Sequence, residues 1–554
     1  MNLTIDGIVV SIEQGECILD AVKKLGMDSD SLKLRPLAAQ IGGEVFSLRY
    51  TPFRDVNIHL LRYGEEMGRR VYERTLEFVL ITSARKLFPG ARVYVRYSLG
   101  PGLYISVEKP QSEAIFTEQD VLDLESEMRR LVRLSLPLER KRLSINDALR
   151  HFEEDGQEDK AALLRWRKFS YFDVYSAEGY MDYFYGEMAP STSYVDVFRI
   201  RYLDGALVML MPRSDAPDVP SDFKEMPKLA NVFLQSDRWG KLMNCDSVNQ
   251  LNSHVENGTI RELIRVNEAL HERSYSEIAD KIVAKKARAV MVAGPSSSGK
   301  TTSAHRIATQ LRVLGQNPVM LSLDNYYLDR DVIPLDEHGE RDLEHINTLD
   351  IPQFNADLVL LMQGQEVEVP EFDFTTGKRA PHGKLMKLHS DEPLIVEGIH
   401  GLNPVLISKN VDPNDVFRVY VSALTTLNID DHNRIRTTDV RLLRRLVRDY
   451  STRNAPMEKT LSMWPSVRRG EETWIFPYQE NGDAFFNTTL VYEIAVLKKY
   501  VYPLLTAMAP ESPYYAMSRD IVKFLNYFLD ADVENEIPPT SILREFIGGN
   551  TFYL

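Results

Sequence analysis

A glycine-rich loop between a predicted strand and a predicted helix constrains this chain more than any other feature. Residues 289–311 read AVMVAGPSSSGKTTSAHRIATQL, which fulfils the pattern G-x-x-x-x-G-K-[ST]. The defining positions are Gly294, Gly299, Lys300 and Thr301. Residues 289–293 predict a buried strand, and the apolar spacing over 302–314 predicts a helix that stops at Gly315. A phosphate-binding loop requires this order of strand, loop and helix.

The loop, residues 294–302, is called the Gly loop below, and its chemistry suits phosphate. Backbone N–H groups and a helix N-terminus attract anions. Lys300 is expected to reach the terminal phosphates of ATP, and the Thr301 hydroxyl to ligate Mg²⁺. The alternative is an ordinary flexible turn before a helix. The predicted ATP-binding residues are Gly294, Pro295, Ser296, Ser297, Ser298, Gly299, Lys300, Thr301 and Thr302.

Composition narrows the class of protein. A chain of 554 residues is long enough for about three or four domains, and a hydrophobic fraction of 44% is typical of folded domains. The net charge of −14 argues against a broad nucleic-acid-coating role. No apolar run approaches the ~18 residues of a membrane span, and the first residues lack a signal-peptide pattern. Two cysteines give neither a disulfide framework nor a cysteine-based zinc site. We therefore expect a cytoplasmic protein without a membrane partner.

The chain divides into five predicted regions. Residues 1–61 predict a small α+β unit with a hairpin at its start, and residues 62–210 alternate helices and strands. Residues 211–286 begin with a proline-rich, acidic linker and continue as a helical connector. Residues 287–510 alternate strands and helices, which indicates a parallel sheet flanked by helices. Residues 511–554 are expected to pack as a tail on a domain surface.

Two acidic residues follow predicted strands of the C-terminal half. Asp324 comes after residues 319–323, and Glu397 comes after residues 393–396. Ligands of open α/β sheets lie beyond the carboxyl ends of the strands, so both side chains can face one bound nucleotide. One carboxylate could hold Mg²⁺, and the other could accept a proton from an acceptor hydroxyl. The alternative is a pair of routine strand-end carboxylates that cap helices.

A run of arginines follows the fourth predicted strand. On one face of a predicted helix, the spacing places Arg441, Arg444, Arg445 and Arg448. This face could belong to a lid that closes over phosphates and stabilises the transferring charge. The alternative is a solvated basic face paired with Asp439 and Asp449. No guanine-reading Asn-Lys-x-Asp motif is present, so a small-molecule kinase fits the pattern best.

On these motifs, residues 287–505 resemble the uridine kinase/phosphoribulokinase family. The segments that carry the likeness are LSLDNYY, RDLEHINTLD, PLIVEGIHGL and RLLRRLVRDYSTR. The resemblance implies that Asp324 is the catalytic base and Tyr327 a nucleoside contact. It also implies that Glu344 holds the ribose hydroxyls and that Glu397 holds Mg²⁺. It makes three lid residues phosphate contacts: Arg445, Arg448 and Arg453.

Two positions depart from the family pattern. The base-recognition segment appears as PEFDFTTGKR, in which Phe372 and Arg379 match but Gly377 stands where the family has histidine. The second arginine of the lid is replaced by Ala455. The first departure weakens the inference to uracil and leaves the base preference open, whereas the kinase chemistry is less affected.

The N-terminal half resembles other proteins. Residues 1–61 look like a TGS domain, a β-grasp fold, and residues 62–210 look like the second additional domain of threonyl-tRNA synthetase. The likeness to the latter rests on ARKLFPGARV, GPGLYISVE and YMDYFYGEMAPST. At the places of the family's His and Cys editing residues the chain has Arg74, Phe78, Phe184 and Met188. We therefore expect no editing of aminoacyl-tRNA by this region. It could instead be a structural or regulatory module, or it could bind a ligand or a partner.

The combined expectation is an α/β P-loop kinase domain preceded by the TGS-like and synthetase-like α+β modules, as in long-form bacterial nucleoside kinases. It would transfer the γ-phosphate of ATP, with Mg²⁺, to a ribose 5′-hydroxyl. The catalytic residues would be Asp324, Lys300 and Arg448; the substrate contacts Tyr327, Glu344, Phe372, Arg379, Arg445 and Arg453; the Mg²⁺ ligands Thr301 and Glu397. Alternatives are a kinase of another sugar or sugar-phosphate and a nucleotide-switched, RNA-associated regulator. The oligomeric state, a homo-oligomer included, stays open.

Overall fold

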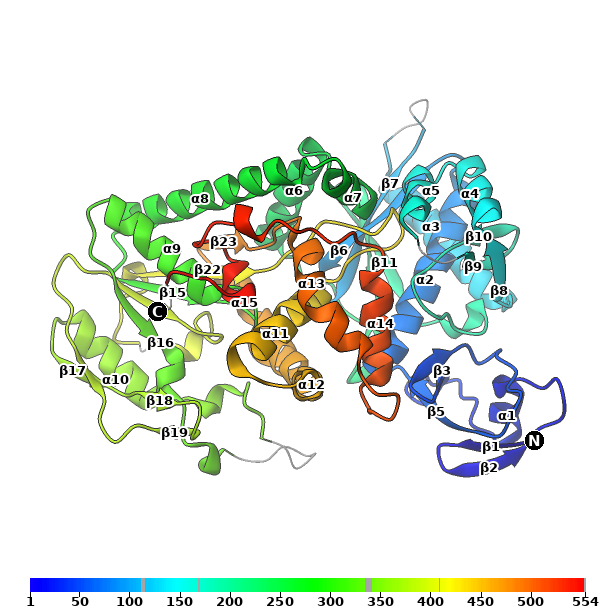
Figure 1. Ribbon diagram of the computed structural model, residues 1–554, viewed down its shortest axis with the longest axis horizontal. Coiled ribbons are helices and arrows are strands. Elements are labelled where there is room, and N and C mark those ends of the chain that lie inside the picture. Colours follow the sequence, from blue (N-terminus) through cyan, green and yellow to red (C-terminus); the bar gives the residue numbers. More distant parts are fainter. Residues whose placement is uncertain (111–114, 168–169, 334–340, 408, 553–554) are drawn as a thin grey trace.

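The computed structural model describes residues 1–110, 115–167, 170–333, 341–407 and 409–552 (Figure 1). The blue and cyan elements of the N-terminal half lie on one side, and the green and yellow elements of the C-terminal half lie on the other. The last part of the chain, in red, runs back over the C-terminal half. Among the described residues, no helix is both long and apolar enough to cross a membrane.

The first unit is a five-stranded mixed sheet in the order β2-β1-β5-β3-β4. Its elements are β1 (Asn2–Ile5), β2 (Ile8–Ser11), α1 (Ile18–Lys24), β3 (Pro36–Ile41), β4 (Glu44–Phe46) and β5 (Val56–Arg62). The turn between β1 and β2 uses Asp6 and Gly7 with positive φ angles of 45° and 86°, which is the backbone that Asp-Gly hairpins require. Strand β5 pairs parallel with β1 and antiparallel with β3.

The second unit packs helices on a four-stranded antiparallel sheet, β11-β12-β7-β6, and adds a three-stranded sheet, β10-β9-β8. The strands are β6 (Arg92–Leu99), β7 (Gly102–Glu108), β8 (Glu139–Ser144), β9 (Tyr171–Ala177), β10 (Tyr180–Asp182), β11 (Arg199–Leu203) and β12 (Ala206–Leu210). The helices are α2 (Glu66–Leu87), α3 (Glu118–Leu134), α4 (Ile145–Glu154) and α5 (Glu158–Leu163). Thr117 caps α3 by accepting a hydrogen bond from the Asp120 N–H.

A hairpin and three helices join the halves. They are β13 (Pro212–Arg213), β14 (Ala216–Pro220), α6 (Pro227–Leu242), α7 (Val248–Glu256) and α8 (Ile260–Lys285). The proline-rich stretch that was expected as a linker therefore contains a short antiparallel pair. Helix α8 ends just before the parallel sheet and packs on it through Tyr275, Ile278 and Ile282.

The C-terminal half is built on a five-stranded parallel sheet in the order β16-β21-β15-β22-β23. The strands are β15 (Ala289–Ala293), β16 (Val319–Ser322), β21 (Leu394–Glu397), β22 (Val416–Ser422) and β23 (Ala484–Asn487). Helices α8 and α9 (Lys300–Val313) cover one face of the sheet, and α10 (Ile351–Met362) covers the other. The expected α/β class with a parallel sheet is confirmed.

Small strands and further helices complete this half. They are β17 (Val367–Val369), β18 (Phe372–Asp373), β19 (Lys378–Arg379), β20 (Lys384–Met386), α11 (Thr437–Arg453), α12 (Met457–Trp474), α13 (Glu493–Thr506), α14 (Tyr515–Leu525) and α15 (Arg544–Ile547). One apolar core includes Phe152 and Phe172 of the N-terminal half together with Leu427, Ile429 and Leu443 of the C-terminal half. The two halves therefore share a buried core and are not separate domains joined only by a linker.

Candidate active site

The Gly loop leaves β15 at Ala293 and enters α9 at Lys300. Gly299 has a φ of +85°, a left-handed backbone that favours glycine. A Cβ atom at Gly294 would lie 1.8 Å from the carbonyl oxygen of Val421, so only glycine fits where the loop crosses the neighbouring strand β22. The two defining glycines thus have local steric reasons, and the expected strand and helix flank them.

Helix α11 holds the Gly loop from outside. The Arg441 guanidinium donates to the Ser296 carbonyl oxygen at 3.0 Å, and Arg444 donates to that of Ser297 at 3.4 Å. Arg445 donates to the Ser296 hydroxyl at 3.0 Å. These contacts hold two loop carbonyl groups and one loop hydroxyl against α11, so the helix helps to fix the shape of the loop.

Arg441 and Arg444 are buried, at 1% and 0% exposed, so the alternative of a solvated basic face is wrong for both. Each has a buried carboxylate partner: Arg441 pairs with Glu471 and Arg444 with Glu493. Buried guanidinium–carboxylate pairs of this kind keep their charges compensated. Glu471 also accepts from the Ser296 N–H at 3.1 Å, which ties α12 to the same loop.

The two strand-end carboxylates meet as expected. Strands β16 and β21 are neighbours with Ser322 opposite Glu397. Glu397 accepts from the Ser322 hydroxyl at 2.9 Å and from the Thr301 hydroxyl at 3.4 Å. Asp324, two residues beyond the end of β16, donates its backbone N–H to the Ser322 hydroxyl at 3.3 Å. The parallel register therefore brings both carboxylates to the carboxyl edge of the sheet beside the Gly loop.

Both carboxyl groups are harder to ionise than usual. Burial is the main cause that raises the pKa of Glu397 to about 7, the Asp324 charge raises it further, and Lys300 opposes them. Burial also raises the pKa of Asp324, against the charges of Lys300, Arg453 and Arg448. A bound cation would favour ionisation of both. Hydroxyl and carboxylate oxygens are donors that Mg²⁺ prefers, so Thr301 and Glu397 fit the expected metal site.

A group of aromatic rings lies next to these carboxylates. The Tyr327 ring lies 5.7 Å from that of Phe372 and 6.3 Å from that of Phe374. Burial, followed by the charges of Asp324 and Glu344, raises the pKa of Tyr327 well above its usual value. This side chain is therefore close to the carboxylates and stays a neutral phenol. Aromatic faces of this kind are suited to stacking against a nucleobase.

Arg379 is used to position this aromatic group. Its guanidinium donates to the carbonyl oxygens of Tyr327 at 2.9 Å and Tyr326 at 3.0 Å, and to Gln353 at 2.8 Å. Its backbone N–H donates to Asp329 at 2.9 Å. The guanidinium thus clamps the segment that follows β16, while a direct contact of Arg379 with substrate stays a prediction.

The unexpected Gly377 lies in the hairpin between β18 and β19. Its φ of +72° is left-handed, and a Cβ atom there would lie 2.6 Å from the Arg330 side chain. Arg330 also donates its N–H to the Gly377 carbonyl oxygen at 3.0 Å. The glycine thus has a structural reason, and a histidine at this position would be strained.

Glu344 lies at the same site, packed on α12. A Cβ atom at Gly470 would lie 2.2 Å from that of Glu344, so the glycine permits the close approach. Burial raises the pKa of Glu344 to about 7, with Arg445 acting in the opposite direction. The carboxyl group is therefore available as a hydrogen-bonding partner for hydroxyl groups, which agrees with the predicted role.

His400 is a candidate site residue that was not among the predicted ones, although it stands in the quoted PLIVEGIHGL segment. It is 1% exposed, and neither ring nitrogen makes a well-formed hydrogen bond to the residues that the structure describes. Burial is the main cause that lowers its pKa to about 3; Lys300 adds to this, and the Glu344 backbone opposes it. A neutral imidazole near Lys300 and Glu344 that lacks good partners is a candidate for substrate contact.

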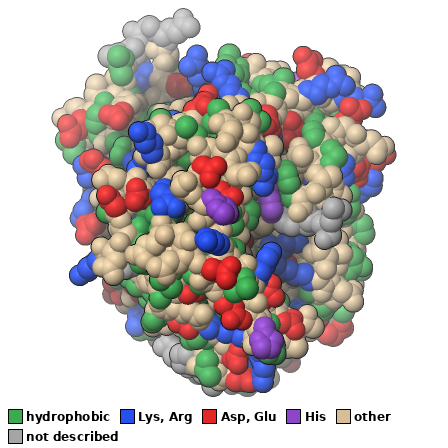
Figure 2. All heavy atoms as spheres, turned by 90° about the vertical axis from the view of Figure 1, so that its left-hand side faces the viewer, with side chains coloured by type: hydrophobic (Ala, Val, Ile, Leu, Met, Phe, Trp, Pro, Cys, Tyr) green, Lys and Arg blue, Asp and Glu red, His purple; other side chains and the backbone are tan. Residues whose placement is uncertain are grey.

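The C-terminal turn of α11 gathers the remaining arginines around Asp449. This carboxylate lies 3.3 Å from Arg445, 2.9 Å from Arg448 and 3.4 Å from Arg453. Asp449 thus offsets part of the positive charge and orients the group. That the three arginines contact phosphate, and that α11 acts as a lid, stay predictions. The described face of this half is hollowed near its middle, and Lys, Arg and His side chains gather there (Figure 2).

Comparison with known proteins bears on this site. Residues 289–495 match the model of the Phosphoribulokinase / Uridine kinase family. The uridine kinase of Lactobacillus helveticus is 29% identical over 173 residues, which are 31% of this chain and 72% of that protein. The range matched by the family model includes the Gly loop, both strand-end carboxylates and α11. The expected likeness of the C-terminal half to this family is thereby confirmed.

Other matches are to threonine–tRNA ligases, over the N-terminal half, and to solved structures. The threonine–tRNA ligase of Symbiobacterium thermophilum is 27% identical over 202 residues, 36% of this chain and 30% of the ligase. The chain thus spans about a third of the ligases that it matches. Among solved structures, a possible uridine kinase from Bacillus stearothermophilus has a TM-score of 0.27 at 18% identity, covering 39% of this chain and 98% of its own. A putative fructose transport system kinase from Silicibacter sp. TM1040 has a TM-score of 0.29 at 16% identity, covering 38% and 98%.

In the synthetase-like unit, the four positions that correspond to the family's editing residues carry other side chains, as the sequence predicts. Phe78, Phe184 and Met188 are 1%, 2% and 0% exposed. Arg74 donates to the Tyr185 carbonyl oxygen. The His432 ring of the C-terminal half stacks on Phe184 with 6.3 Å between centroids and 11° between planes. The kinase-like half therefore reaches into this place with its own side chain.

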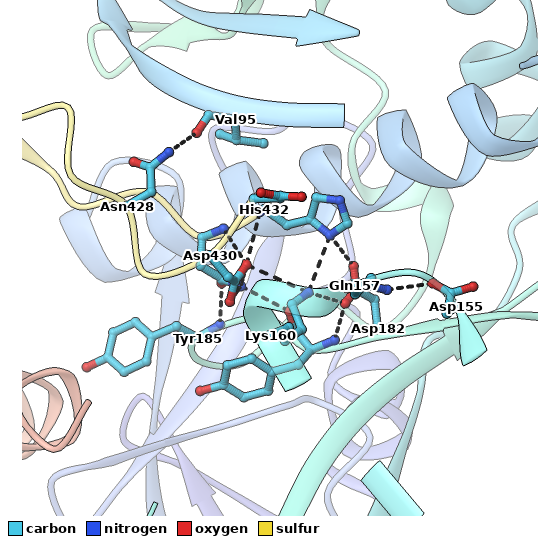
Figure 3. A network of polar contacts seen from close by, with 12 residues as sticks. Val95, Asp155, Gln157, Lys160, Asp182, Tyr185, Asn428, Asp430 and His432 are labelled. Atoms are coloured by element: carbon cyan, nitrogen blue, oxygen red, sulfur yellow. Dashed lines mark hydrogen bonds and ion pairs between the residues drawn. The ribbon is translucent and has the colours of Figure 1, made fainter. Parts of the chain in front are cut away.

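His432 belongs to a buried polar network that joins the halves (Figure 3). Its Nδ1 lies 2.7 Å from an Asp182 oxygen, and Lys160 pairs with Asp182 and lies 3.7 Å from Asp430. Asn428 donates to the Val95 carbonyl oxygen at 3.0 Å. Two acids and one lysine of this network are at most 2% exposed, so the connection from β22 to α11 is docked on the N-terminal half.

Proposed function

We propose that this protein is an ATP-dependent kinase that transfers the γ-phosphate of ATP to the 5′-hydroxyl of a nucleoside. The observation that carries the proposal is the meeting of Asp324 and Glu397 with Lys300 and Thr301 beside the Gly loop. This arrangement supplies a base, a cationic phosphate contact and two oxygen donors within one site. Membership of residues 289–495 in the matched family supports a P-loop kinase in general.

In the proposed reaction each residue has a separate task. The loop N–H groups and Lys300 bind and orient the ATP phosphates. Thr301 and Glu397 would hold Mg²⁺, which when bound offsets phosphate charge. Asp324 accepts the proton of the attacking hydroxyl as the new O–P bond forms and the bond to the leaving ADP breaks. Arg445, Arg448 and Arg453 would bind the transferring phosphoryl group, and Glu344 the sugar hydroxyls.

The aromatic group favours a nucleoside over a sugar-phosphate acceptor. Tyr327, Phe372 and Phe374 form a ring cluster next to the carboxylates, and Phe374 is 53% exposed. A sugar-phosphate needs basic partners rather than aromatic faces. Gly377 in place of the family histidine removes one base contact, so the base preference is the part of the proposal that experiment must supply.

The test is ADP release by the purified chain with ATP, Mg²⁺ and a panel of nucleosides and pentose phosphates. Lys300→Ala is the control for the Gly loop. Asp324→Asn should leave ATP binding nearly intact and reduce turnover by on the order of 100-fold or more. Unchanged turnover in Asp324→Asn would rule out Asp324 as the base. Turnover on pentose phosphates alone would move the acceptor to the sugar-phosphate class.

For the N-terminal half we propose a positioning role. Arg74 and three apolar side chains stand at the positions of the editing residues, and His432 stacks on one of them, Phe184, which supports the absence of editing chemistry. The N-terminal half holds the segment that leads into α11, and α11 contacts the Gly loop.

The partners that the proposed kinase reaction requires are ATP and the acceptor.

A further inference from the structure

The last residues that the structure describes lie against the Gly loop. Glu545 accepts hydrogen bonds from the Thr302 hydroxyl at 2.6 Å and from the Thr302 backbone N–H at 3.3 Å. Asn550 donates to the same hydroxyl at 3.3 Å. The ring of Phe552 stacks on that of His305, one turn further along α9, at 5.3 Å. Residues 541–552, called the C-terminal segment below, therefore follow the first turns of α9.

Apolar contacts anchor the C-terminal segment. Ile542, Leu543 and Phe546 are each 0% exposed. A Cβ atom at Gly299 would lie 2.9 Å from the Ile542 side chain. The Arg444 guanidinium lies over the Phe546 ring at 5.1 Å. The same arginine that holds the Gly loop thus holds this segment, so the position of Glu545 is set by its neighbours on both sides.

The donors that Glu545 occupies belong to a phosphate site. The N–H groups in the first turn of a helix attract anions, and in a Gly loop of this pattern they bind nucleotide phosphates. A carboxylate resembles a phosphate oxygen pair in charge and in its acceptor geometry. Because like charges in one site repel each other, Glu545 and a phosphate cannot share the Thr302 donors at low cost.

We propose that the C-terminal segment is an internal, displaceable ligand of the Gly loop, in which Glu545 competes with nucleotide phosphate for Thr302. Nucleotide binding then requires that Glu545 leaves these donors. The inference rests on the proposed function only in taking the Gly loop as the nucleotide site; it does not depend on the acceptor. It gives the protein a built-in restraint on ATP occupancy.

The test compares ATP affinity in Glu545→Gln and wild type by calorimetry. The glutamine keeps the size and an acceptor oxygen but removes the charge, so ATP should bind on the order of tenfold more tightly, a change of about 1.4 kcal/mol. Adenosine, which lacks phosphate, should bind both proteins equally. Glu536→Gln is the matched control, because Glu536 precedes the segment and pairs with Arg261 and Arg265 at 3.5 and 3.6 Å, away from the loop. Equal or weaker ATP binding by Glu545→Gln would overturn the proposal.

A second measurement uses the wild-type chain alone. Hydrogen exchange of the amides of residues 541–552 should become faster when ATP is saturating, since the segment loses its contacts to Thr302. Unchanged protection with ATP bound would overturn the proposal even if Glu545→Gln failed to fold. Tighter ATP binding by Glu545→Gln without turnover on any acceptor would support the inference and contradict the kinase function. Turnover with unchanged affinity would do the reverse.

Discussion

Replacement of Lys160 by methionine tests how the two halves are held together. The ammonium is 2% exposed and lies between Asp182, at 0%, and Asp430, at 1%. Methionine keeps most of the length of the side chain but removes its charge. Two buried carboxylates then lose the cation that offsets them, one in each half of the molecule. Asp182 keeps its contacts with His432, the Tyr180 hydroxyl and the Tyr183 N–H.

The expected magnitude follows from this burial. Breaking a buried charge pair by removing one partner costs about 3–5 kcal/mol, because the remaining charge is left without compensation. For units of about 150–250 residues, each kcal/mol lowers the melting temperature by about 2–4 °C. Lys160→Met should therefore lower the midpoint of thermal unfolding by about 6–20 °C, as measured by calorimetry.

The matched control is Lys86→Met. Lys86 lies in the same half, pairs with Glu127 at 2.9 Å and is 48% exposed. Such a partly exposed pair is worth about 1 kcal/mol or less, so this variant should melt within about 4 °C of wild type. A second variant, Lys160→Met with Asp182→Asn, should recover part of the loss because one uncompensated charge is gone. The reasoning is refuted if Lys160→Met melts no lower than Lys86→Met, or if the second change lowers the midpoint further.

Three further predictions concern the candidate site. The pKa of Glu344 in the folded protein is about 7, above its unfolded value, so the folded protein loses stability as pH rises from about 4.5 to about 7. Glu344→Gln should therefore be about 3 kcal/mol more stable than wild type at pH 8 and nearly equal to it at pH 4. Melting midpoints of both proteins at the two pH values measure this. Gly377→Ala should lower the free energy of unfolding by about 1–2 kcal/mol, because the backbone at this position is left-handed, and should raise the KM for the acceptor. Wild-type stability and KM would contradict a role of the hairpin between β18 and β19 in the site. His400→Leu should keep the melting midpoint but lower kcat/KM by about tenfold or more, which is the size expected for the loss of one polar contact. Unchanged kinetics would show that His400 has a structural role.

The local elements of the site could be predicted because short-range rules decide them. Residues 289–293 form the expected strand, and the expected helix after the Gly loop ends beside Gly315, which has a φ of +80°. The meeting of Asp324 and Glu397 also followed from one physical rule, since the carboxyl ends of parallel strands share an edge. These features depend only on local sequence patterns and on which strands are neighbours in the sheet.

Features that depend on distant partners could not be predicted in this way. Helical spacing placed Arg441 and Arg444 on one face, but it does not tell which carboxylates bury them; the partners Glu471 and Glu493 stand on two later helices. The same holds for Glu545, which meets Thr302 across 243 residues. Charge pairing over such separations is a property of the packed core, and a single sequence carries no local signal for it.

Helix α11 is the element on which these long-range contacts converge. At its start, Asp439 pairs with Arg70 of α2 at 2.7 Å, and Glu73 of α2 pairs with Arg434 and Arg436 just ahead of the helix. Two residues after Asp439 begin the arginines that contact the Gly loop.

The separation between an N-terminal contact and a loop contact on α11 is thus less than one helical turn. Packed interiors are hardly compressible and transmit displacement. A movement of α2 relative to the parallel sheet must therefore change the position of Arg441 against Ser296, unless the helix end unwinds. The C-terminal segment also contacts this helix, through Arg444 and Phe546. The geometry of the Gly loop consequently depends on contacts from the N-terminal half and from the C-terminal segment, which gives the N-terminal half a physical route to the loop.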